Sequence, residues 1–201
     1  MKILHLDSSV TGAVSVSRPL TAEAAETLKA ANPGAEYVYR DLTKNTLRHY
    51  TAVLRTYGDN LEQVTPEQKA ELETGKEILQ EFLSADTILI GAPMYNFSVP
   101  SQLKAWIDLI AVPGVTFKYG ANGAEGQCGG KKVVIISTRG GMYGPGSPFE
   151  ANDFQEKYLR AVFGFLGITD ITVITAEGVA YGPDKAAAAV EAAKAKIADL
   201  K

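Results

Sequence analysis

The chain has 201 residues, of which 46% are hydrophobic and 21% are charged, a composition typical of a soluble globular protein. Its formal net charge of −3 at pH 7 argues against nucleic acid and anionic membranes as partners, because both attract basic surfaces. The single cysteine, Cys128, excludes an internal disulfide, and no apolar stretch approaches the roughly 20 residues that span a bilayer. We therefore expect one cytoplasmic domain over residues 1–201, without a signal peptide.

Strand-like and helix-like segments alternate along the chain. Five β-rich runs predict strands at residues 2–7, 36–41, 86–92, 131–138 and 170–176. The third and fourth runs are nearly continuous in Ile, Val and Leu, as in strands that are covered on both faces. Helical spacing covers residues 17–31, 66–84, 100–111, 150–166 and 184–200. Residues 42–64 are long for a crossover loop and are expected to include a short helix of their own.

Two helix starts show capping signals. Thr65, Pro66 and Gln68 form a capping box with proline at the first helical position. Ser17 is predicted to be the N-cap of the first helix, with Pro19 two residues further on.

This alternation predicts an α/β fold of the flavodoxin-like type. The expected core is a doubly wound, five-stranded parallel sheet of order 2-1-3-4-5, with helices on both faces. Ligands of such sheets bind outside the carboxyl ends of the strands, near the switch point between the first and third strands. The loops that follow residues 7, 92 and 138 are therefore the candidates for a site.

The first of these loops, "DSSVTGAVSVSRP" at residues 7–19, is rich in hydroxyl groups. It has one glycine and no lysine, so it is neither a dinucleotide fingerprint nor a P-loop. A helix N-terminus surrounded by hydroxyls suits one terminal phosphate held without a metal. The alternative is a polar loop whose serine only caps the helix. The hydroxyls belong to Ser8, Ser9, Thr11, Ser15 and Ser17.

The second loop, in "GAPMYNFSVP" at residues 91–100, has large side chains where loops usually have small polar ones. It could plug the core, bind a partner or form the wall of a site for a flat ligand. Its place at the ligand edge, and the interruption of its apolar surface by Pro93, Asn96 and Ser98, favour the wall. The third loop, "TRGGMYGPG" at residues 138–146, has two glycines that allow close backbone approach, or it is simply a flexible turn. Together the loops predict a mononucleotide cofactor, with its phosphate at the first loop and its ring between the other two.

Several stretches resemble the bacterial family of FMN-dependent NADH azoreductases and NADH:quinone oxidoreductases. The most specific are "MYNF" at 94–97, "GVTF" at 114–117 and "RGG" at 139–141, and the likeness extends through "AEGVAYGP" at 176–183 over essentially the whole chain. The resemblance implies a homodimer with one FMN per subunit and sites at the subunit interface. It also implies that NAD(P)H drives the two-electron reduction of quinones and azo compounds. A ring held between the second and third loops has one open face, so the donor and the acceptor are expected to use that face in turn, in a ping-pong mechanism.

The resemblance also assigns residues to the site. It places the FMN phosphate at Ser9, Ser15, Val16 and Ser17, although family members often have glutamine where this chain has Val16, so a side-chain contact is lost there. It places the ribityl chain and ring at Pro93, Met94, Tyr95, Asn96, Phe97, Thr138, Arg139, Gly140 and Gly141. The implied substrate contacts are Phe117, Tyr119 and Tyr143. No catalytic side chain and no metal ligand is expected, because the flavin supplies the redox chemistry.

Other functions share parts of this pattern. A flavodoxin-type electron carrier has the same fold but usually a strongly acidic face, which a net charge of −3 supports only weakly. A nicotinamide dehydrogenase needs the missing glycine fingerprint, although Asp41 stands near the place of its acidic residue. A phosphorylation receiver is excluded because Ala92 and Pro93 follow the third strand where its acceptor aspartate would stand.

Four further expectations concern single residues and one helix. His5 is expected to be a strand histidine, Cys128 a loop thiol without a chemical role, and His49 a candidate for the border of the substrate mouth. The helix at 100–111 is predicted to pack against its symmetry mate in a two-fold dimer. The face expected at that interface consists of Leu103, Trp106, Ile107 and Ile110.

Overall fold

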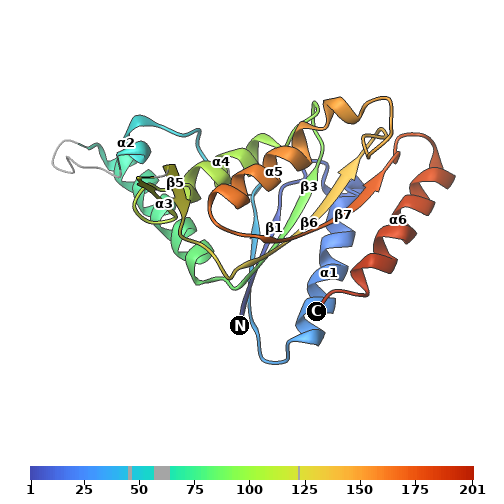
Figure 1. Cartoon of the computed structure of the whole chain (residues 1–201), viewed down its shortest axis with the longest axis horizontal. Coiled ribbons are helices and arrows are strands. Elements are labelled where there is room, and N and C mark those ends of the chain that lie inside the picture. The colour runs from blue at the N-terminus through green and yellow to red at the C-terminus, as the bar shows by residue number, and fades with distance from the viewer. Residues whose placement is uncertain (45–46, 57–63, 122) are drawn as a thin grey trace.

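A parallel five-stranded sheet forms the centre of the molecule in the computed structural model, which describes residues 1–44, 47–56, 64–121 and 123–201. Its spatial order is β2-β1-β3-β6-β7 (Figure 1). Every neighbouring pair is parallel. Counted within this sheet, the order is the predicted 2-1-3-4-5. The strands are β1 (Lys2–Asp7), β2 (Glu36–Asp41), β3 (Thr87–Pro93), β6 (Lys132–Arg139) and β7 (Asp170–Glu177).

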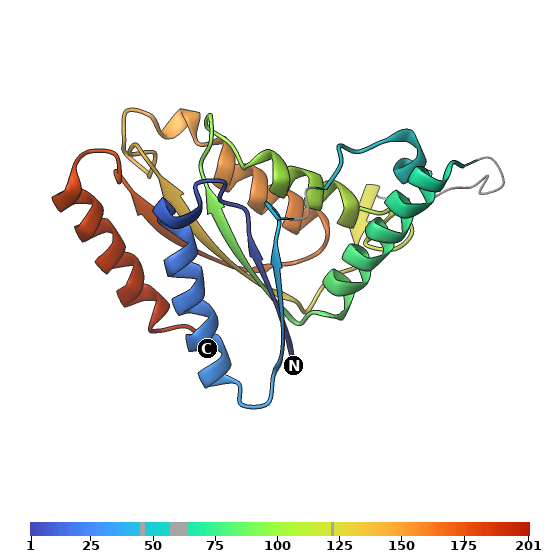
Figure 2. The ribbon, with the colours of Figure 1, turned by 180° about the vertical axis from the view of Figure 1, so that it is seen from behind.

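Helices cover both faces of the sheet, as Figures 1 and 2 show from opposite sides. On one face α1 (Ser17–Ala31) and α6 (Pro183–Ile197) enclose a core with Leu89 and Val134. On the other face α3 (Pro66–Ser84), α4 (Ser101–Ile110) and α5 (Phe154–Phe165) enclose a core with Ile88 and Val133. Successive strand residues point to opposite faces, so a strand between two cores is apolar throughout, and all seven residues of β3 are buried. Within the described ranges, no helix combines the length and apolar character that a membrane span requires.

Several predicted helix ends are confirmed. The capping box of α3 is present, since Thr65 Oγ1 accepts from Gln68 N at 3.3 Å and Gln68 Oε1 accepts from Thr65 N at 2.8 Å. The 42–64 segment does include a short helix, α2 (Ala52–Arg55), although positions 45–46 and 57–63 lie outside the described residues.

The start of α5 lies later than predicted, because Asp153 Oδ1 caps it by accepting from the N–H groups of Gln155 and Glu156.

The predicted N-cap of α1 is wrong by two residues. Ser15 has an extended backbone, and its Oγ accepts from Arg18 N at 3.2 Å, as an N-cap side chain does. Val16 already has helical angles, with φ −81° and ψ −35°. The cause is a 3₁₀ turn at Gly12–Val14, which directs the chain into the helix at Ser15.

The expectation that α4 presents an apolar face to a symmetry mate is also wrong. Leu103, Trp106, Ile107 and Ile110 are each at most 2% exposed and belong to the core of their own chain. Trp106 makes a T-shaped contact with Phe82 of α3, with ring centroids 5.8 Å apart. Helical spacing predicts that a face is buried but not what buries it, and here the covering surface is the sheet and α3.

A small antiparallel hairpin, β4 (Phe117–Gly120) with β5 (Gly123–Gly126), was not predicted. Its strands are short and rich in glycine, so they lack a clear alternation of apolar and polar residues. Gly126 lies so close to the end of α5 that a Cβ would fall 2.1 Å from Gly167 N. The hairpin is therefore packed tightly against the end of α5.

Candidate functional site

The three predicted loops converge at the carboxyl edge of the sheet. In the register of β3 and β6, Pro93 lies opposite Thr138, so the second and third loops start side by side. Together with the first loop they form a depression of about 150 Å³. Its lining comprises Ser9, Thr11, Val14, Ser15 and Val16, then Pro93, Met94 and Tyr95, then Thr138, Arg139 and Gly140, and finally Val179. The structure thus brings together nine of the predicted cofactor contacts in one place.

Hydrogen bonds between the loops hold them in register. Met94 N donates to Thr138 O at 2.8 Å, which joins the second loop to the third. The Tyr95 hydroxyl accepts from Val10 N at 3.2 Å and lies 3.4 Å from Ser9 Oγ, which joins the second loop to the first. Ser8 Oγ donates to Gly91 O at 2.6 Å just beneath them. Contacts within the chain therefore fix the three loops around the depression.

The first loop offers the features of an anion site. Hydroxyls of Ser9, Thr11 and Ser15 line the depression beside the start of α1, where the first N–H groups of a helix have no intrahelical acceptor. Ser17 itself is 1% exposed and lies behind Ser15, with the two hydroxyl oxygens 3.2 Å apart. Ser15 thus lines the depression, whereas the side chain of Ser17 does not.

An ion pair supports the first loop from behind. Arg18 donates to Ser9 O from Nε and Nη2, at 3.3 and 2.9 Å, and to both oxygens of Asp41 at 2.9 Å. Burial alone would raise the pKa of Asp41, but hydrogen bonds from Arg18 and Thr43 lower that pKa to about 2. The charge of Arg18 is therefore already neutralised, and its role is to fix the carbonyl of Ser9.

A second buried carboxylate, Asp7, lies at the end of β1 beside this ion pair. Burial alone would raise its pKa, but contacts with His5, Thr21 and Tyr39 together lower it. The adjacent carboxylate and burial raise the pKa of Tyr39 to about 12. His5 is 2% exposed and its Nδ1 lies 2.7 Å from the Tyr37 hydroxyl, which confirms a histidine of the strand interior.

The second loop contains a strained turn. Tyr95 and Ser98 exchange backbone hydrogen bonds at 2.9 and 3.0 Å, and Asn96 and Phe97 between them have φ of 49° and 70°. Positive φ at both central residues is the pattern of a type I′ hairpin turn, which asparagine tolerates and a bulky residue rarely adopts. The Phe97 ring is 48% exposed and meets Tyr143 at a centroid distance of 6.2 Å. Strain that presents a large ring to solvent is typical of a functional site.

Arg139 lines the depression, although its guanidinium is directed toward carboxylates that lie outside it. The guanidinium is 1% exposed and pairs with Asp153 at 3.0 Å and Glu156 at 3.1 Å. Only the backbone of Arg139 is thus available at the depression. The sequence gives no sign of this, since the three carboxylates around it lie at positions 153, 156 and 177.

The predicted substrate residues do not share one site within a single chain. Phe117 and Tyr119 lie on the hairpin, where Phe117 packs on Phe165, the last residue of α5, at 4.6 Å. The first residue of α5, Phe154, donates its N–H to Phe97 O at 3.2 Å. A helix of 12 residues separates these contacts by about 18 Å. Tyr143 therefore lies beside the three loops, and Phe117 and Tyr119 lie far from them.

Two further lining residues, which the resemblance did not assign to the cofactor, have a detectable signal in the sequence. Thr11 lies among the hydroxyls of the first loop. Val179 lies in the "AEGVAYGP" segment, where its N–H donates to Arg139 O at 3.2 Å. We find no signal in the sequence for Val14, which is 82% exposed.

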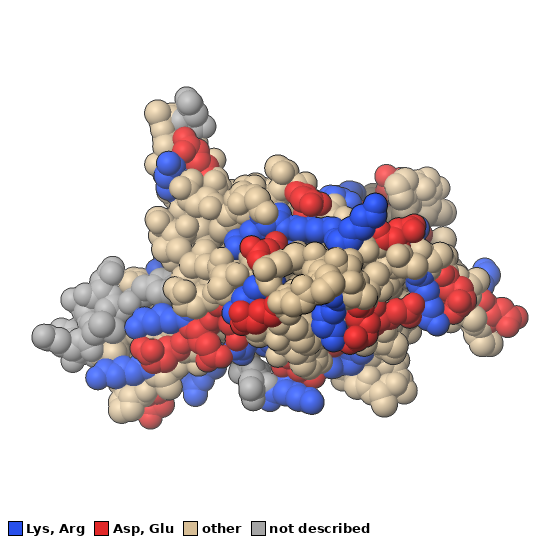
Figure 3. All heavy atoms as spheres, turned by 90° about the horizontal axis from the view of Figure 1, so that it is seen from below, with Lys and Arg blue, Asp and Glu red and all other residues tan. Residues whose placement is uncertain are grey.

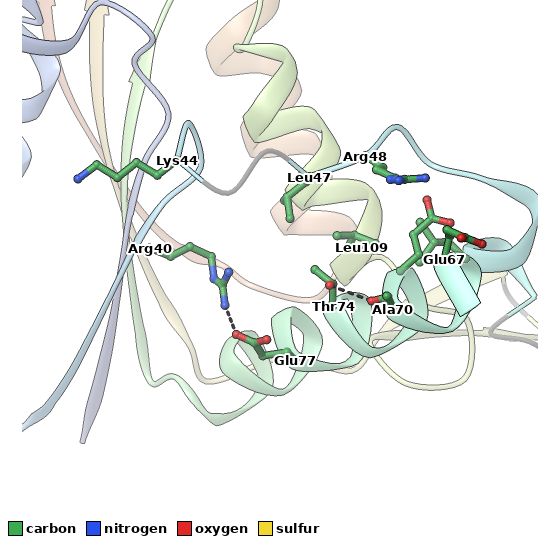
Figure 4. A pocket seen from close by; sticks show the side chains of 11 residues that line it. Arg40, Lys44, Leu47, Arg48, Glu67, Ala70, Thr74, Glu77 and Leu109 are labelled. Carbon is green, nitrogen blue, oxygen red and sulfur yellow. Dashed lines mark hydrogen bonds and ion pairs between the residues drawn. The ribbon is translucent and has the colours of Figure 1, made fainter. Parts of the chain in front are cut away.

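A different cavity, of about 600 Å³, lies between α3 and the connection from β2 to α2 (Figure 4). It contains none of the predicted site residues. One of its basic side chains, Arg40, points to Glu77 and forms an ion pair with it. Arg40 also pairs with Glu81. His49 lines a neighbouring cavity of about 530 Å³ beside α2 and α3, so the structure does not place it at the three loops.

The surface charge of the face in Figure 3 is mixed, with acidic and basic side chains interspersed. Pairs such as Lys104 with Asp108 contribute to this pattern elsewhere on the surface. The face in Figure 3 therefore lacks the uniformly acidic character that is typical of a docking face of an electron carrier.

Comparison with known proteins adds a family to this geometry. Residues 1–200 match the family model described as flavodoxin-like fold. A protein of Sinorhizobium medicae (strain WSM419) named FMN-dependent NADH:quinone oxidoreductase is 51% identical over 199 residues, which cover 99% of this chain and 96% of that protein. A protein of Bradyrhizobium sp. (strain BTAi1 / ATCC BAA-1182) with the same name is 50% identical over 202 residues, covering 100% and 99%.

Solved structures agree with these relatives. An azoreductase from Bacillus anthracis str. Sterne superposes with a TM-score of 0.89 at 28% identity and covers 98% of this chain and 97% of its own. An FMN-dependent NADH-azoreductase from Bacillus anthracis str. Ames Ancestor, in complex with FMN, superposes with a TM-score of 0.88 at 27% identity, with coverage of 98% and 96%. The chain therefore belongs to the flavodoxin-like family that includes the proteins named FMN-dependent NADH:quinone oxidoreductase.

Proposed function

We propose that this protein is an FMN-dependent oxidoreductase that uses NAD(P)H to reduce quinones and azo compounds. The observation that carries the proposal is the convergence of three loops on one depression, with hydroxyls and a helix N-terminus on one side and the backbone of Met94 and Gly140 on the other. The names of the relatives and the FMN complex of a structural neighbour support the same cofactor and donor. Bound FMN supplies the two-electron redox chemistry.

The residues of the depression fit this cofactor. A wider cavity of about 620 Å³ adjoins the depression, shares Tyr95 with it and is also lined by Asn96, Val99 and Tyr158. Together the two spaces fall in the range of pockets that bind ligands of mononucleotide size. The narrow part has the hydroxyls of Ser9, Thr11 and Ser15, which suit a phosphate, and the wider part has the flat side chains of Tyr95 and Tyr158, which suit a ring.

We assign roles in binding and orientation accordingly. Hydroxyls of Ser9 and Ser15 and the N–H groups of Val16 and Ser17 hold the phosphate. Backbone N–H groups of the second and third loops stabilise negative charge on a reduced ring, as preorganised donors do in other redox sites. The remaining proposed contacts with the ribityl chain and ring are Pro93, Met94, Tyr95, Asn96, Phe97, Thr138, Arg139, Gly140 and Gly141.

We further propose a homodimer, which brings the substrate residues together. Tyr119 is 76% exposed at the hairpin, and the buried ring of Phe117 supports it edge-on at 5.6 Å. Because the hairpin lies about 18 Å from the loops along α5, Tyr119 reaches an acceptor beside Tyr143 only when it comes from a second copy. The proposed unit is the whole chain, 1–201, and the single buried cysteine supports a cytoplasmic location.

Ser15→Asp tests the phosphate site. Aspartate accepts from Arg18 N as serine does, so the stability of the apoprotein is expected to stay the same. Its charge repels a phosphate, so FMN affinity is expected to fall at least about a hundredfold, while riboflavin, which has no phosphate, is affected far less. Titration of both flavins into wild type and variant measures the difference. Equal weakening of the two flavins would show that the phosphate does not lie on this loop.

The matched control is Ser15→Ala. It removes the cap, so it is expected to lower the free energy of unfolding by about 1 kcal/mol. It also removes one hydrogen bond to the phosphate, so FMN affinity should fall about tenfold.

The kinetics of the FMN-loaded protein test whether donor and acceptor share one site. If NADH and a quinone use that site in turn, steady-state rates at several quinone concentrations should give parallel double-reciprocal lines.

A further inference from the structure

Glu177, the last residue of β7, connects that strand to the third loop. Its Oε2 accepts from the backbone N–H groups of Tyr143 and Gly144, at 2.9 and 3.0 Å. The residue stands in "AEGVAYGP", a segment to which none of the roles above assigns a side chain. The same oxygen lies 3.8 Å from Arg139 Nη1. One carboxylate thus contacts both the middle of the loop and the guanidinium at its start.

Arg139 ties the two ends of this loop together. It is the last residue of β6, and its guanidinium pairs with Asp153 and Glu156 at the start of α5, the next α-helix after the loop. Its Nε donates to Ser137 Oγ at 3.1 Å, so both the Nε and the Nη atoms of the side chain have partners. Buried charges of this kind are strongly coupled, because removal of one leaves the others uncompensated.

Backbone contacts make the approach of the two segments specific. The N–H groups of Gly178, Val179 and Ala180 donate to carbonyls of Gly141, Arg139 and Gly140, at 2.9, 3.2 and 3.1 Å. A Cβ on Gly144 would lie 2.8 Å from Glu177 Oε1, and a Cβ on Gly178 would lie 2.9 Å from Met142 Sδ. Glycine at these positions permits the close contact.

The bond from Tyr143 N to Glu177 fixes the backbone that carries the ring of Tyr143. It packs edge-on against Phe97 at 6.2 Å and lies 6.4 Å from Phe149. Phe97 is fixed in turn by its strained hairpin. These three residues, Phe97, Tyr143 and Phe149, form an aromatic wall at the carboxyl edge of the sheet.

We propose that Glu177 is a positioning residue for the electron acceptor: by holding the amides of Tyr143 and Gly144, it sets the aromatic wall against which a flat quinone or azo compound lies. This inference rests on the proposed function. A carboxylate suits the role because it can accept from two N–H groups while it faces a guanidinium, and bonds to a charged acceptor are stronger than neutral ones.

The test compares Glu177→Ala, Glu177→Gln and the control Glu150→Ala. Glu150 Oε2 accepts from Gly146 N in the same loop, so the control loosens the loop without touching the amide of Tyr143. In the apoprotein, hydrogen exchange at the Tyr143 and Gly144 amides is expected to rise about ten- to a hundredfold in Glu177→Ala. In Glu177→Gln it should rise less, because the amide oxygen still accepts, and this isosteric variant serves if Glu177→Ala does not fold. Glu150→Ala should change exchange at Gly146 alone.

The FMN-loaded proteins supply the second readout. KM for a benzoquinone is expected to rise about three- to tenfold in Glu177→Ala, with kcat little changed, because the wall contacts the acceptor without taking part in electron transfer. Glu150→Ala should leave this KM unchanged. Unchanged exchange at Tyr143 and Gly144 in both Glu177 variants overturns the proposal, and so does lost protection with an unaltered KM. Failure of the wild type to bind FMN or to reduce the quinone with NADH overturns the proposed function instead, whatever the exchange shows.

Discussion

Phe97 adopts a backbone conformation that L-residues with large side chains rarely adopt, with φ of 70°. The left-handed region costs about 1–2 kcal/mol for such a residue. The surrounding hairpin and the amide of Phe154, which donates to Phe97 O, hold it there. The stretch "MYNF" therefore has a backbone conformation that lowers the stability of the fold and exposes the ring of Phe97.

Two substitutions at this position separate the strain from the ring. Both Phe97→Gly and Phe97→Ala remove the contact with Tyr143, but only glycine relieves the positive φ. We expect Phe97→Gly to be about 1 kcal/mol more stable than Phe97→Ala in urea unfolding, with both variants equally impaired in quinone reduction. Equal stability would mean that the turn is not strained.

The ion pair of Arg18 with Asp41 makes stability depend on pH. The pKa of Asp41 is about 2 in the folded protein, against about 4 in an unfolded chain. The depressed pKa stabilises the fold above pH 4, and this contribution is lost as pH falls from about 4 towards 2. In Asp41→Asn, the free energy of unfolding should fall less steeply over this interval, as measured by urea titration at successive pH values. An identical slope would show that Asp41 does not titrate in this range.

At the scale of elements, α4 shows the limit of reasoning from sequence. Its spacing correctly marked Leu103, Trp106, Ile107 and Ile110 as buried, but the same pattern suits an oligomer interface and a core equally well. The predicted N-cap of α1 was wrong for a different reason. Ser15 and Ser17 are both plausible caps by type, and the choice depends on the 3₁₀ turn at Gly12–Val14, whose backbone angles the sequence pattern does not reveal.

Trp106→Ala tests the contribution of α4 to the core. Because the ring is fully buried and packs on Phe82, its removal is expected to lower the free energy of unfolding by about 3–5 kcal/mol. Denaturant unfolding at two protein concentrations measures this. An unchanged unfolding midpoint would contradict the packing of Trp106 in the core.

For the whole molecule, the alternation of strands and helices was enough to predict the sheet, its order and the edge at which the three loops form a depression. The positions of loop residues followed from the strand ends, so Ser9, Met94 and Gly140 were predicted to meet. Side-chain direction did not follow, as Arg139 shows, because its carboxylate partners come from α5 and β7. Contacts between chains are harder still to predict from the pattern of one sequence.

Subunit mixing tests the proposed dimer. Ser15→Asp impairs the FMN site of its own subunit, and Tyr119→Ser removes an exposed ring that we expect to act in the other subunit. A mixed dimer then contains one site with both parts intact, so quinone reduction should rise above that of either variant alone after exchange of subunits. No gain on mixing, with heterodimers shown by mass spectrometry, would place Tyr119 in the site of its own chain or outside the site altogether.

The strand order also governs what happens while the protein is being made. β1 pairs with β3, and the bond from Lys2 N to Asp86 at the start of that pairing joins residues 84 positions apart. At roughly 5–20 residues per second, a ribosome needs about 4–17 seconds to deliver the partner strand. Until then one edge of a buried, apolar strand is unpaired and can template pairing with another nascent chain. We therefore expect slower translation between β1 and β3 to lower the fraction of newly made chains that reach the native sheet.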